Sequence, residues 1–275
     1  MYEAYWKLSH KPFPQRIRPE NLYRSQSVQS AVLRLRYCIE NNAGLALLTG
    51  MPGVGKSSLL RTLAGPAPES ACLVHVVFPL LEPDEILRLI AGELVAGLRA
   101  DAAVTHRTTE GTLRQIQACL RAHNREGRHP ILCLDDAHHL SEASFLQVIQ
   151  PLSNLCDLHP DLQVTILLCG QPVLSSHLKR HAQLSHRVAV TATLQGFTES
   201  ETADYVQSSL RHAGANDVVF TDDGMIRLYH VTGGNPRRIN RLCDMALLVG
   251  FADRLLGISA AEIEAVSHEL MAAAA

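Results

Sequence analysis

Short apolar runs alternate with amphipathic helical stretches over the first two thirds of the chain. The apolar runs lie at 45–49, 72–77, 131–134, 164–169 and 188–194. Brief, almost wholly apolar runs of this kind are typical of strands buried on both faces of a parallel sheet. Helical spacing of apolar residues is found between them, near 57–65, 84–98, 110–124, 142–155 and 172–183. The pattern predicts an α/β fold with a five-stranded parallel sheet covered by helices on both faces.

The pattern changes after Gly196, because the rest of the chain carries helical signals only. The segment TESETADYVQSSLRHAG starts with Thr198 and acidic residues and stops at Gly214, as a capped helix does. Further helical stretches follow near 222–232, 236–250 and 259–271. We therefore expect three segments: an N-terminal collar leading into the base at 1–40, an α/β base domain at 41–197 and a helical domain at 198–275.

Composition and charge narrow the class of protein. The chain has 275 residues, 47% of them hydrophobic and 19% charged, which is typical of a globular protein and excludes a disordered or fibrous one. Its 25 basic and 27 acidic residues give a net charge of −2, so overall basicity offers no argument for nucleic-acid binding. The first 40 residues carry seven basic and three acidic side chains, a local charge of +4. This segment is either a solvated surface or a contact for phosphate or nucleic acid.

Cysteine usage and hydropathy indicate the compartment. The seven cysteines form no CxxC pair, and several lie in apolar runs such as ILCLDD and TILLCG. We interpret them as reduced core residues of a cytoplasmic protein. The N-terminus lacks the apolar core of a signal peptide, and no apolar run reaches the ~18 residues that span a bilayer. A role at a membrane would therefore require a partner.

The segment GMPGVGKSS matches the phosphate-loop pattern G-x-x-x-x-G-K-[ST] and falls between a predicted strand and a predicted helix. Glycines let the backbone approach phosphate groups, whose charge is also favoured at a helix N-terminus. Lys56 is expected to reach the β- and γ-phosphates, and the Ser57 hydroxyl to bind Mg²⁺. The expected nucleotide-binding residues are Gly50, Gly53, Val54, Gly55, Lys56, Ser57 and Ser58.

The strand in ILCLDDAHHL ends in two aspartates, which are candidates for the metal and for catalysis. A carboxylate at the end of a buried strand beside a phosphate loop can hold Mg²⁺, and its neighbour can orient an attacking water. We assign Asp135 to the metal and Asp136 to the water. Nearby histidines lack a cysteine or carboxylate at ligand spacing, so we interpret them as surface residues rather than metal ligands. They are His138, His139, His177, His181 and His186.

A phosphate loop followed by an acidic strand end makes the chain resemble the AAA+ ATPases, and among them the ExeA/GspA family of secretion-associated ATPases. The resemblance rests on MYEAYWKLSHKPFPQ, ENLYRSQ, LLTGMPGVGKSSLLR, ILCLDDAHHL, LQVTILLCGQPVL, LSHRVAV and TGGNPRRINRLCDMALL. It implies a base with strand order 5-1-4-3-2 and a C-terminal α-helical lid. The family usually has Asp-Glu where this chain has Asp135-Asp136, and the shorter side chain implies slow hydrolysis or closure induced by a neighbour.

The resemblance also implies roles for three further residues. Gln171 matches the position that senses the γ-phosphate, although it could simply turn the chain there. Arg187 matches the arginine inserted into a neighbouring subunit's site, with Arg180 as its competitor. Arg237 matches a lid arginine that contacts ATP, with Arg238 as its substitute.

The sequence around Arg237 by itself also favours the binding of an anion there. Asn235 is a good N-cap and Pro236 a good first helical residue, so Arg237 falls in the first turn of a helix. A cation there opposes the helix dipole unless an anion comes to it.

Three functions follow from these expectations. The first is a Mg²⁺-dependent ATPase that assembles with copies of itself and remodels a protein partner of the envelope or secretion machinery, with the inner membrane as a candidate location of that partner. The second is a DNA-associated ATPase of the kind that assists transposition, which net charge disfavours. The third is an ATP-gated interaction protein with very slow hydrolysis. Secretion relatives continue into a membrane span and a peptidoglycan-binding region, whereas this sequence ends in ELMAAAA, which weakens the expectation of a secretion role.

Overall fold

The computed structural model describes residues 1–14, 22–63, 71–77, 80–98, 108–159 and 161–272. The chain divides into two units, each described by itself below: Gln26–Met51 with Lys56–Leu194, and Met1–Ser25 with Pro52–Gly55 and Gln195–Ala275. The first is termed the sheet unit and the second the helical unit. No helix in the described ranges is long and apolar enough to cross a membrane.

The sheet unit contains five parallel strands in the order β2-β3-β4-β1-β5, as the resemblance implied. All residues of β1 and β4 are buried, whereas the edge strand β5 alternates between buried and exposed positions over part of its length. This difference is expected, because central strands of a covered sheet meet apolar layers on both faces. The strands are β1 (Leu45–Gly50), β2 (Ala71–Val76), β3 (His129–Leu134), β4 (Thr165–Gly170) and β5 (Val188–Leu194).

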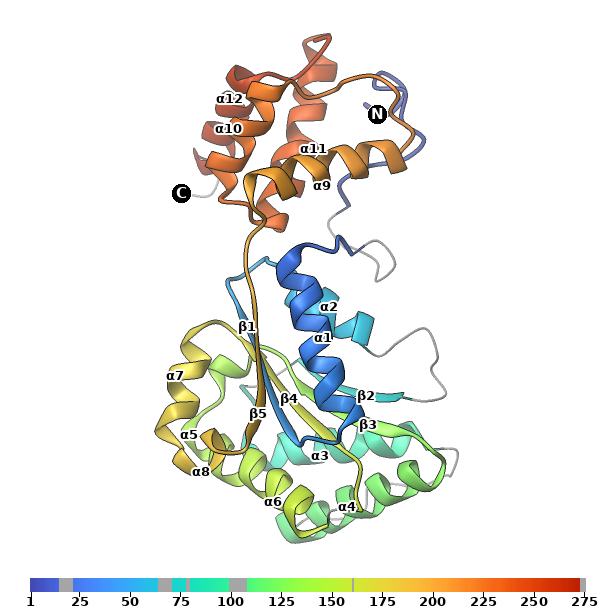
Figure 1. Ribbon diagram of the computed structural model, residues 1–275, viewed down its shortest axis with the longest axis vertical. Coiled ribbons are helices and arrows are strands. Elements are labelled where there is room, and N and C mark those ends of the chain that lie inside the picture. The colour runs from blue at the N-terminus through green and yellow to red at the C-terminus, as the bar shows by residue number, and fades with distance from the viewer. Residues whose placement is uncertain (15–21, 64–70, 78–79, 99–107, 160, 273–275) are drawn as a thin grey trace. The chain divides into compact units, whose positions relative to one another are not determined.

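Helices cover both faces of this sheet (Figure 1). Alternate residues of the strands pack with α3, α4 and α6 into a single core that includes Ile86, Leu120 and Leu152. On the other face, α1 contacts β1, β5 and α2. The described helices of this unit are α1 (Gln26–Glu40), α2 (Lys56–Leu63), α3 (Pro83–Ala96), α4 (Thr109–Arg125), η2 (Ala137–His139), α5 (Glu142–Ser144), η3 (Phe145–Ile149), α6 (Gln150–Leu158), α7 (Val173–Arg180) and α8 (Ala182–Ser185).

Two predicted helices of the sheet unit are interrupted in the structure. The helix expected near 142–155 contains a π-helical turn, Phe145–Ile149, before Pro151, whose nitrogen has no hydrogen to donate. The helix expected near 172–183 breaks at His181, which has non-helical backbone angles. The predicted glycine stop of the helix near 57–65 lies outside the described residues.

The helical unit is built from α9 (Glu199–His212), α10 (Asp222–Thr232), α11 (Pro236–Ala252) and α12 (Ala260–Ala272). Its core also takes in the N-terminal residues, with Trp6 and Phe13 buried against these helices. The Trp6 indole N–H donates to the Leu247 carbonyl over 2.9 Å, and the Tyr5 hydroxyl donates to the Leu255 carbonyl over 2.8 Å. The first residues of the chain are therefore part of the helical unit's packing.

The start of α9, predicted as a capped helix, is fixed by a capping box between Thr198 and Glu201. The Thr198 hydroxyl accepts from the Glu201 N–H over 3.2 Å, and the Glu201 carboxylate accepts from the Thr198 N–H over 3.0 Å. These reciprocal bonds satisfy donors that a helix N-terminus leaves free. At the C-terminal end of α10, Gly233 has a φ of +60°, the left-handed conformation that ends many helices.

Gly234 follows with a φ of +68°, and a Cβ atom there would lie 1.9 Å from the Phe197 carbonyl oxygen. A Cβ at Gly233 would meet no described atom within 4 Å, so it offers a matched control. We expect Gly233→Ala to cost about 1–2 kcal/mol of unfolding free energy from its backbone conformation alone. Gly234→Ala should cost at least about 2 kcal/mol more, because backbone atoms must move. Urea unfolding followed by the fluorescence of Trp6, the single tryptophan, measures the free energy of unfolding of the helical unit. Equal losses of this free energy in the two variants would contradict the packing described.

Candidate functional site

The parallel sheet brings the ends of three neighbouring strands to one edge. The order β3-β4-β1 places the last residues of these strands side by side, and each is followed by a candidate residue or loop. The phosphate-loop segment follows β1, Asp135 and Asp136 follow β3, and Gln171 follows β4. Ligand sites of open α/β sheets commonly lie at this edge.

The loop between β1 and α2 has the backbone that its glycines predict. Gly53 and Gly55 have φ values of +85° and +99°, where most side chains would be strained. A Cβ at Gly55 would meet no described atom within 4 Å, so the loop leaves open space there for an approaching group. Val54 is buried, and α2 begins directly after the loop at Lys56. This backbone fits the cradling of phosphate groups.

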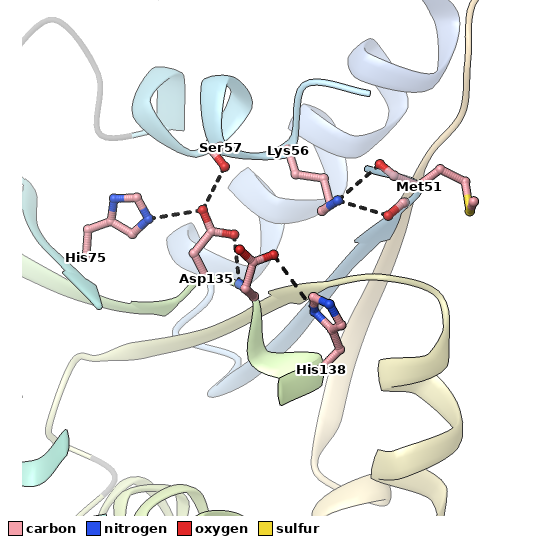
Figure 2. A network of polar contacts seen from close by, with 8 residues as sticks. Met51, Lys56, Ser57, His75, Asp135 and His138 are labelled. Atoms are coloured by element: carbon pink, nitrogen blue, oxygen red, sulfur yellow. Dashed lines mark hydrogen bonds and ion pairs between the residues drawn. The ribbon is translucent and has the colours of Figure 1, made fainter. Parts of the chain in front are cut away.

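The Lys56 side chain folds back toward the loop (Figure 2). Its ammonium donates to the Gly50 carbonyl over 2.9 Å and to the Met51 carbonyl over 3.1 Å, and the residue is only 8% exposed. A buried ammonium requires such partners, because its loss of hydration is costly. Binding a phosphate would replace these carbonyls with a charged acceptor, which forms a stronger hydrogen bond.

Ser57 and Asp135 join α2 to the end of β3. The Ser57 hydroxyl donates to Asp135 Oδ2 over 2.7 Å, and the Asp136 N–H donates to Asp135 Oδ1 over 3.0 Å. His75 on β2 also approaches this carboxylate, with its Nε2 3.4 Å from Oδ2, the oxygen that accepts from Ser57 (Figure 2). A hydroxyl and a carboxylate held together form the hard oxygen donor set that Mg²⁺ prefers, so these residues fit that ion.

The pKa of Asp135 shows the balance of these contacts. Burial by itself raises the pKa of the carboxyl, whereas hydrogen bonds from His75, Ser57, the Asp136 N–H and the Cys169 thiol lower it. The hydrogen bonds prevail, and the pKa of Asp135 lies well below its ordinary value. Asp135 is therefore a carboxylate at neutral pH, as a metal ligand must be.

Asp136 differs from Asp135 in both backbone and exposure. Its φ of 49° and ψ of 32° place it in the left-handed region, and its side chain is 59% exposed. Non-glycine residues in this region cost about 1–3 kcal/mol and cluster at functional sites, although aspartate tolerates it better than most. The left-handed turn directs the chain from β3 into η2 and leaves the carboxylate accessible to water.

His138 is buried, which corrects its interpretation as a surface residue. Neither ring nitrogen has a hydrogen-bond partner among the described residues, and Nδ1 lies 3.9 Å from Asp136 Oδ1. Burial and the neighbouring His139 lower the pKa of His138. The interpretation rested on the lack of ligand partners at suitable spacing, which says nothing about burial, whereas packing in η2 places this ring inside. Among the described residues, no group of three or more His, Cys, Asp or Glu side chains lies close enough together to hold a metal ion.

Gln171 lies directly after β4 and is half-buried. Its carbonyl accepts from the Leu174 N–H over 2.9 Å, so it does help turn the chain into α7. Its position at the end of the strand between β3 and β1 also suits contact with a ligand at this edge. Both expectations are thus compatible with its place in the fold.

The two candidate finger arginines have different surroundings. Arg187 donates to the Asn154 side chain and forms an ion pair with Asp157, in which Nη2 and Oδ2 are 2.8 Å apart. Arg180 at the end of α7 is exposed, and within the described residues it has no ion pair. Arg187 is therefore held by its own chain, whereas no ion pair holds the Arg180 side chain among the described residues.

The start of α11 has the geometry predicted from TGGNPRRIN. Asn235 Oδ1 accepts from the N–H groups of Arg237 and Arg238 over 3.1 and 3.4 Å. Both arginine side chains are exposed, and the first turn holds no acidic residue. Within the helical unit, which includes Pro52–Gly55, the Asn235 amide also donates to the Pro52 carbonyl over 2.8 Å. The two cations therefore have no carboxylate in their own helical turn.

The sequence analysis did not identify two of the neighbours of Asp135. His75 is the polar residue within the apolar run CLVHVV, and this interruption was the available signal. Cys169 was interpreted as a small core hydrophobe, and it is fully buried. Its proximity to Asp135 depends on the pairing of β3 with β4, which sequence periodicity does not specify.

Comparisons with known proteins agree with this geometry. Residues 39–178, half of the chain, match the AAA domain family. General secretion pathway protein A of Aeromonas hydrophila is 28% identical over 274 residues. That match covers 98% of this chain and 48% of the relative, so the chain spans about half of the relative's length.

Solved structures share the fold at low sequence identity. ORC2 of Aeropyrum pernix, described in ADPNP and ADP complexes, has a TM-score of 0.67 at 15% identity, covering 95% of this chain and 72% of that one. Cdc6p of Pyrobaculum aerophilum has a TM-score of 0.67 at 18% identity, with coverages of 93% and 68%. The Thermotoga maritima RuvB Holliday junction branch migration motor has a TM-score of 0.57 at 18% identity, with coverages of 95% and 74%. The chain therefore belongs to the AAA domain family and is similar over nearly its whole length to General secretion pathway protein A, as its resemblance to the ExeA/GspA family predicted.

Proposed function

We propose that this chain binds ATP with Mg²⁺ and hydrolyses it to ADP and phosphate, at sites completed by a neighbouring copy of the chain. The observation that carries the proposal is the 2.7 Å hydrogen bond between Ser57 and Asp135, directly after the glycine loop and Lys56. It brings the two expected Mg²⁺ ligands together from segments 78 positions apart in the sequence. A chance glycine turn would not require an acidic strand end at its side.

Each part of the loop has a role in this proposal. The backbone around Gly50, Gly53, Val54 and Gly55 surrounds the phosphates, with the first turn of α2 (Lys56, Ser57 and Ser58) at their side. Lys56 exchanges its carbonyl partners for the β- and γ-phosphates. Ser57 and Asp135 hold Mg²⁺, which supplies positive charge to the phosphate oxygens when bound.

Hydrolysis is assigned to residues beyond the loop. Asp136 orients the attacking water, which its exposed carboxylate can reach. Gln171 senses the γ-phosphate from the end of β4. Arg237 stabilises the nucleotide's negative charge, with Arg238 as the alternative, because neither has a carboxylate in its own helical turn.

Arg187, or Arg180 in its place, is the arginine supplied to a neighbouring copy. For Arg187 this means giving up the Asp157 ion pair when the copies assemble. An ion pair with partly exposed partners is worth about 0–1 kcal/mol, so contact with a γ-phosphate can displace it.

The proposed biological role is based on the similarity to General secretion pathway protein A. By this similarity, the chain is proposed to act from the cytoplasm on a protein partner in secretion or envelope machinery. The seven free thiols agree with a reducing compartment. The chain spans about half of that relative, so the partner and the work done on it are part of the proposal.

Two substitutions should separate ATP binding from hydrolysis. Lys56→Ala removes the ammonium, so we expect weakened ATP binding and loss of turnover. Asp136→Asn keeps a residue that tolerates the left-handed backbone, so ATP binding should persist while turnover falls by about 10²–10⁴-fold. Equilibrium ATP binding and steady-state phosphate release measure the two effects, with the exposed Lys11→Ala as control. Unchanged turnover in either variant would refute the assignment, and tight binding without measurable wild-type turnover would favour an ATP-gated interaction protein.

Mixing variants should show whether sites are shared between copies. Arg187→Ala and Asp136→Asn should each be inactive alone, because a finger removal typically costs about 10³–10⁵-fold. In a 1:1 mixture, about one site in four pairs an intact Asp136 with an intact neighbouring Arg187, so phosphate release should recover. Recovery with Arg180→Ala instead would assign the finger to Arg180. Asp157→Asn is the control, because it breaks the same ion pair but keeps Arg187, so this variant should still release phosphate. If its phosphate release is as low as that of Arg187→Ala, loss of the ion pair rather than loss of the finger explains the inactivity.

A DNA-associated role predicts a different measurement. Part of the +4 N-terminal segment is already engaged: Lys7 pairs with Asp217 over 2.8 Å, and Arg34 donates to the Thr191 carbonyl over 3.0 Å. Arg16 and Arg18 lie outside the described residues. We therefore expect no salt-dependent binding to duplex DNA at low salt, measured by fluorescence anisotropy with and without ATP. Binding that strengthens with ATP would replace the secretion role with the DNA role.

A further inference from the structure

His75 occupies an unusual position for a polar residue in a strand. It lies next to the end of β2 between Val74 and Val76, which are both buried, and its own side chain is 22% exposed. In the ladder it pairs with Cys133 of β3. Since side chains alternate along a strand, His75, Cys133 and Asp135 lie on one face of the sheet. The imidazole therefore points toward the Asp135 carboxylate, as Figure 2 shows.

The backbone fixes this pair from the same two strands. The Asp135 N–H donates to the Val76 carbonyl over 2.9 Å, which extends the β2–β3 ladder one step beyond β3. The positions of His75 and Asp135 are thus set by the sheet rather than by a loop. An imidazole Nε2–H 3.4 Å from Asp135 Oδ2 can restrain rotation of the carboxylate about its side-chain bonds.

Ser57, the other donor to Oδ2, is placed differently. It lies in the first turn of α2, next to Lys56, whose ammonium contacts the loop carbonyls of Gly50 and Met51. Phosphate binding would draw Lys56 away from those carbonyls and engage the Ser57 oxygen. The His75 side chain has no hydrogen bond or ion pair with the loop or with Lys56 among the described residues, so it can keep its contact with Asp135 through such a change.

We propose that His75 is a positioning residue that holds the Asp135 carboxylate in place for Mg²⁺ without itself touching the metal or the nucleotide. The proposal rests on the ATPase function proposed above and adds a residue to its metal site. Groups that hold a metal ligand by a hydrogen bond commonly contribute ~10–100-fold in metal affinity. An imidazole suits this place because it donates one N–H without the permanent positive charge of lysine or arginine, which would repel the ion.

Two variants and a matched control test the hydrogen bond. His75→Leu removes the donor and keeps an apolar side chain of similar bulk, and His75→Gln keeps an N–H donor. His129→Leu is the control, because His129 is also half-buried and bonded to a neighbouring strand, with Nε2 2.9 Å from Thr165 Oγ1. It stands at the first residue of β3, at the opposite end of the strand from Asp135. General damage to the sheet would affect both leucine variants.

Equilibrium binding of ATP to the full chain gives the main measurement. The ratio of the ATP dissociation constant in EDTA to that in Mg²⁺ reports the metal's contribution. We expect His75→Leu to lower this ratio by about 10-fold or more while leaving the EDTA value unchanged. His75→Gln and His129→Leu should keep ratios near that of the wild-type protein. An unchanged ratio in His75→Leu, or an equal loss in His129→Leu, would overturn the proposal.

Nitrogen NMR of the nucleotide-free protein tests the contact itself. One imidazole should show a protonated Nε2 with the shift of a hydrogen bond to a carboxylate, and this signal should disappear in both His75→Leu and Asp135→Asn. Persistence of every such signal in both variants would overturn the contact. If wild-type ATP binding shows no dependence on Mg²⁺, the ATPase proposal fails together with this one. A Mg²⁺-dependent wild-type protein with an unaffected His75→Leu variant refutes the role of His75 alone.

Discussion

Parallel pairing of β1, β4 and β3 is the constraint on which the candidate site depends. In parallel strands all carboxyl ends lie at one edge, so a loop after β1 and a carboxylate after β3 become neighbours without any direct link in sequence. The hydrogen bond from Ser57 to Asp135 spans that edge. Helices on both faces stabilise the arrangement, because the central strands are buried along their whole length.

The same edge concentrates polar groups that are costly to bury. Lys56 and Asp135 are both nearly inaccessible, and each is compensated by several hydrogen bonds. The left-handed backbone of Asp136 adds strain at the next residue. Protein sites commonly retain such costs where the groups have a chemical task. The chain uses lysine at only three other positions, Lys7, Lys11 and Lys179, and here the compact ammonium of Lys56 donates to two loop carbonyls.

The helical unit depends on the chain's first residues as well as on its last. Trp6, Tyr5 and Phe13 complete the core formed by α9 to α12, and a Cβ at Gly250 would lie 2.8 Å from the Trp6 ring. The N-terminal segment therefore stabilises this unit by packing. Any contact of its charged residues with a phosphate or a partner would come in addition to that role.

The sequence by itself determined the five strands, most of the helical segments, the phosphate loop and the acidic strand end, because each has a local pattern of hydrophobicity, glycine or charge. It did not predict α1 or the interruptions at Phe145–Ile149 and His181. The helix caps at Thr198 and Asn235 are local in the same sense, since each cap bonds to residues within one helical turn. The strand order was obtained only from the family resemblance, and the structure agrees with it. Tertiary structure alone decided the burial of His138, the ion pair of Arg187 with Asp157 and the contact of His75 with Asp135. These features join residues through strand pairing and packing between segments, and no periodicity in the sequence encodes which segments meet.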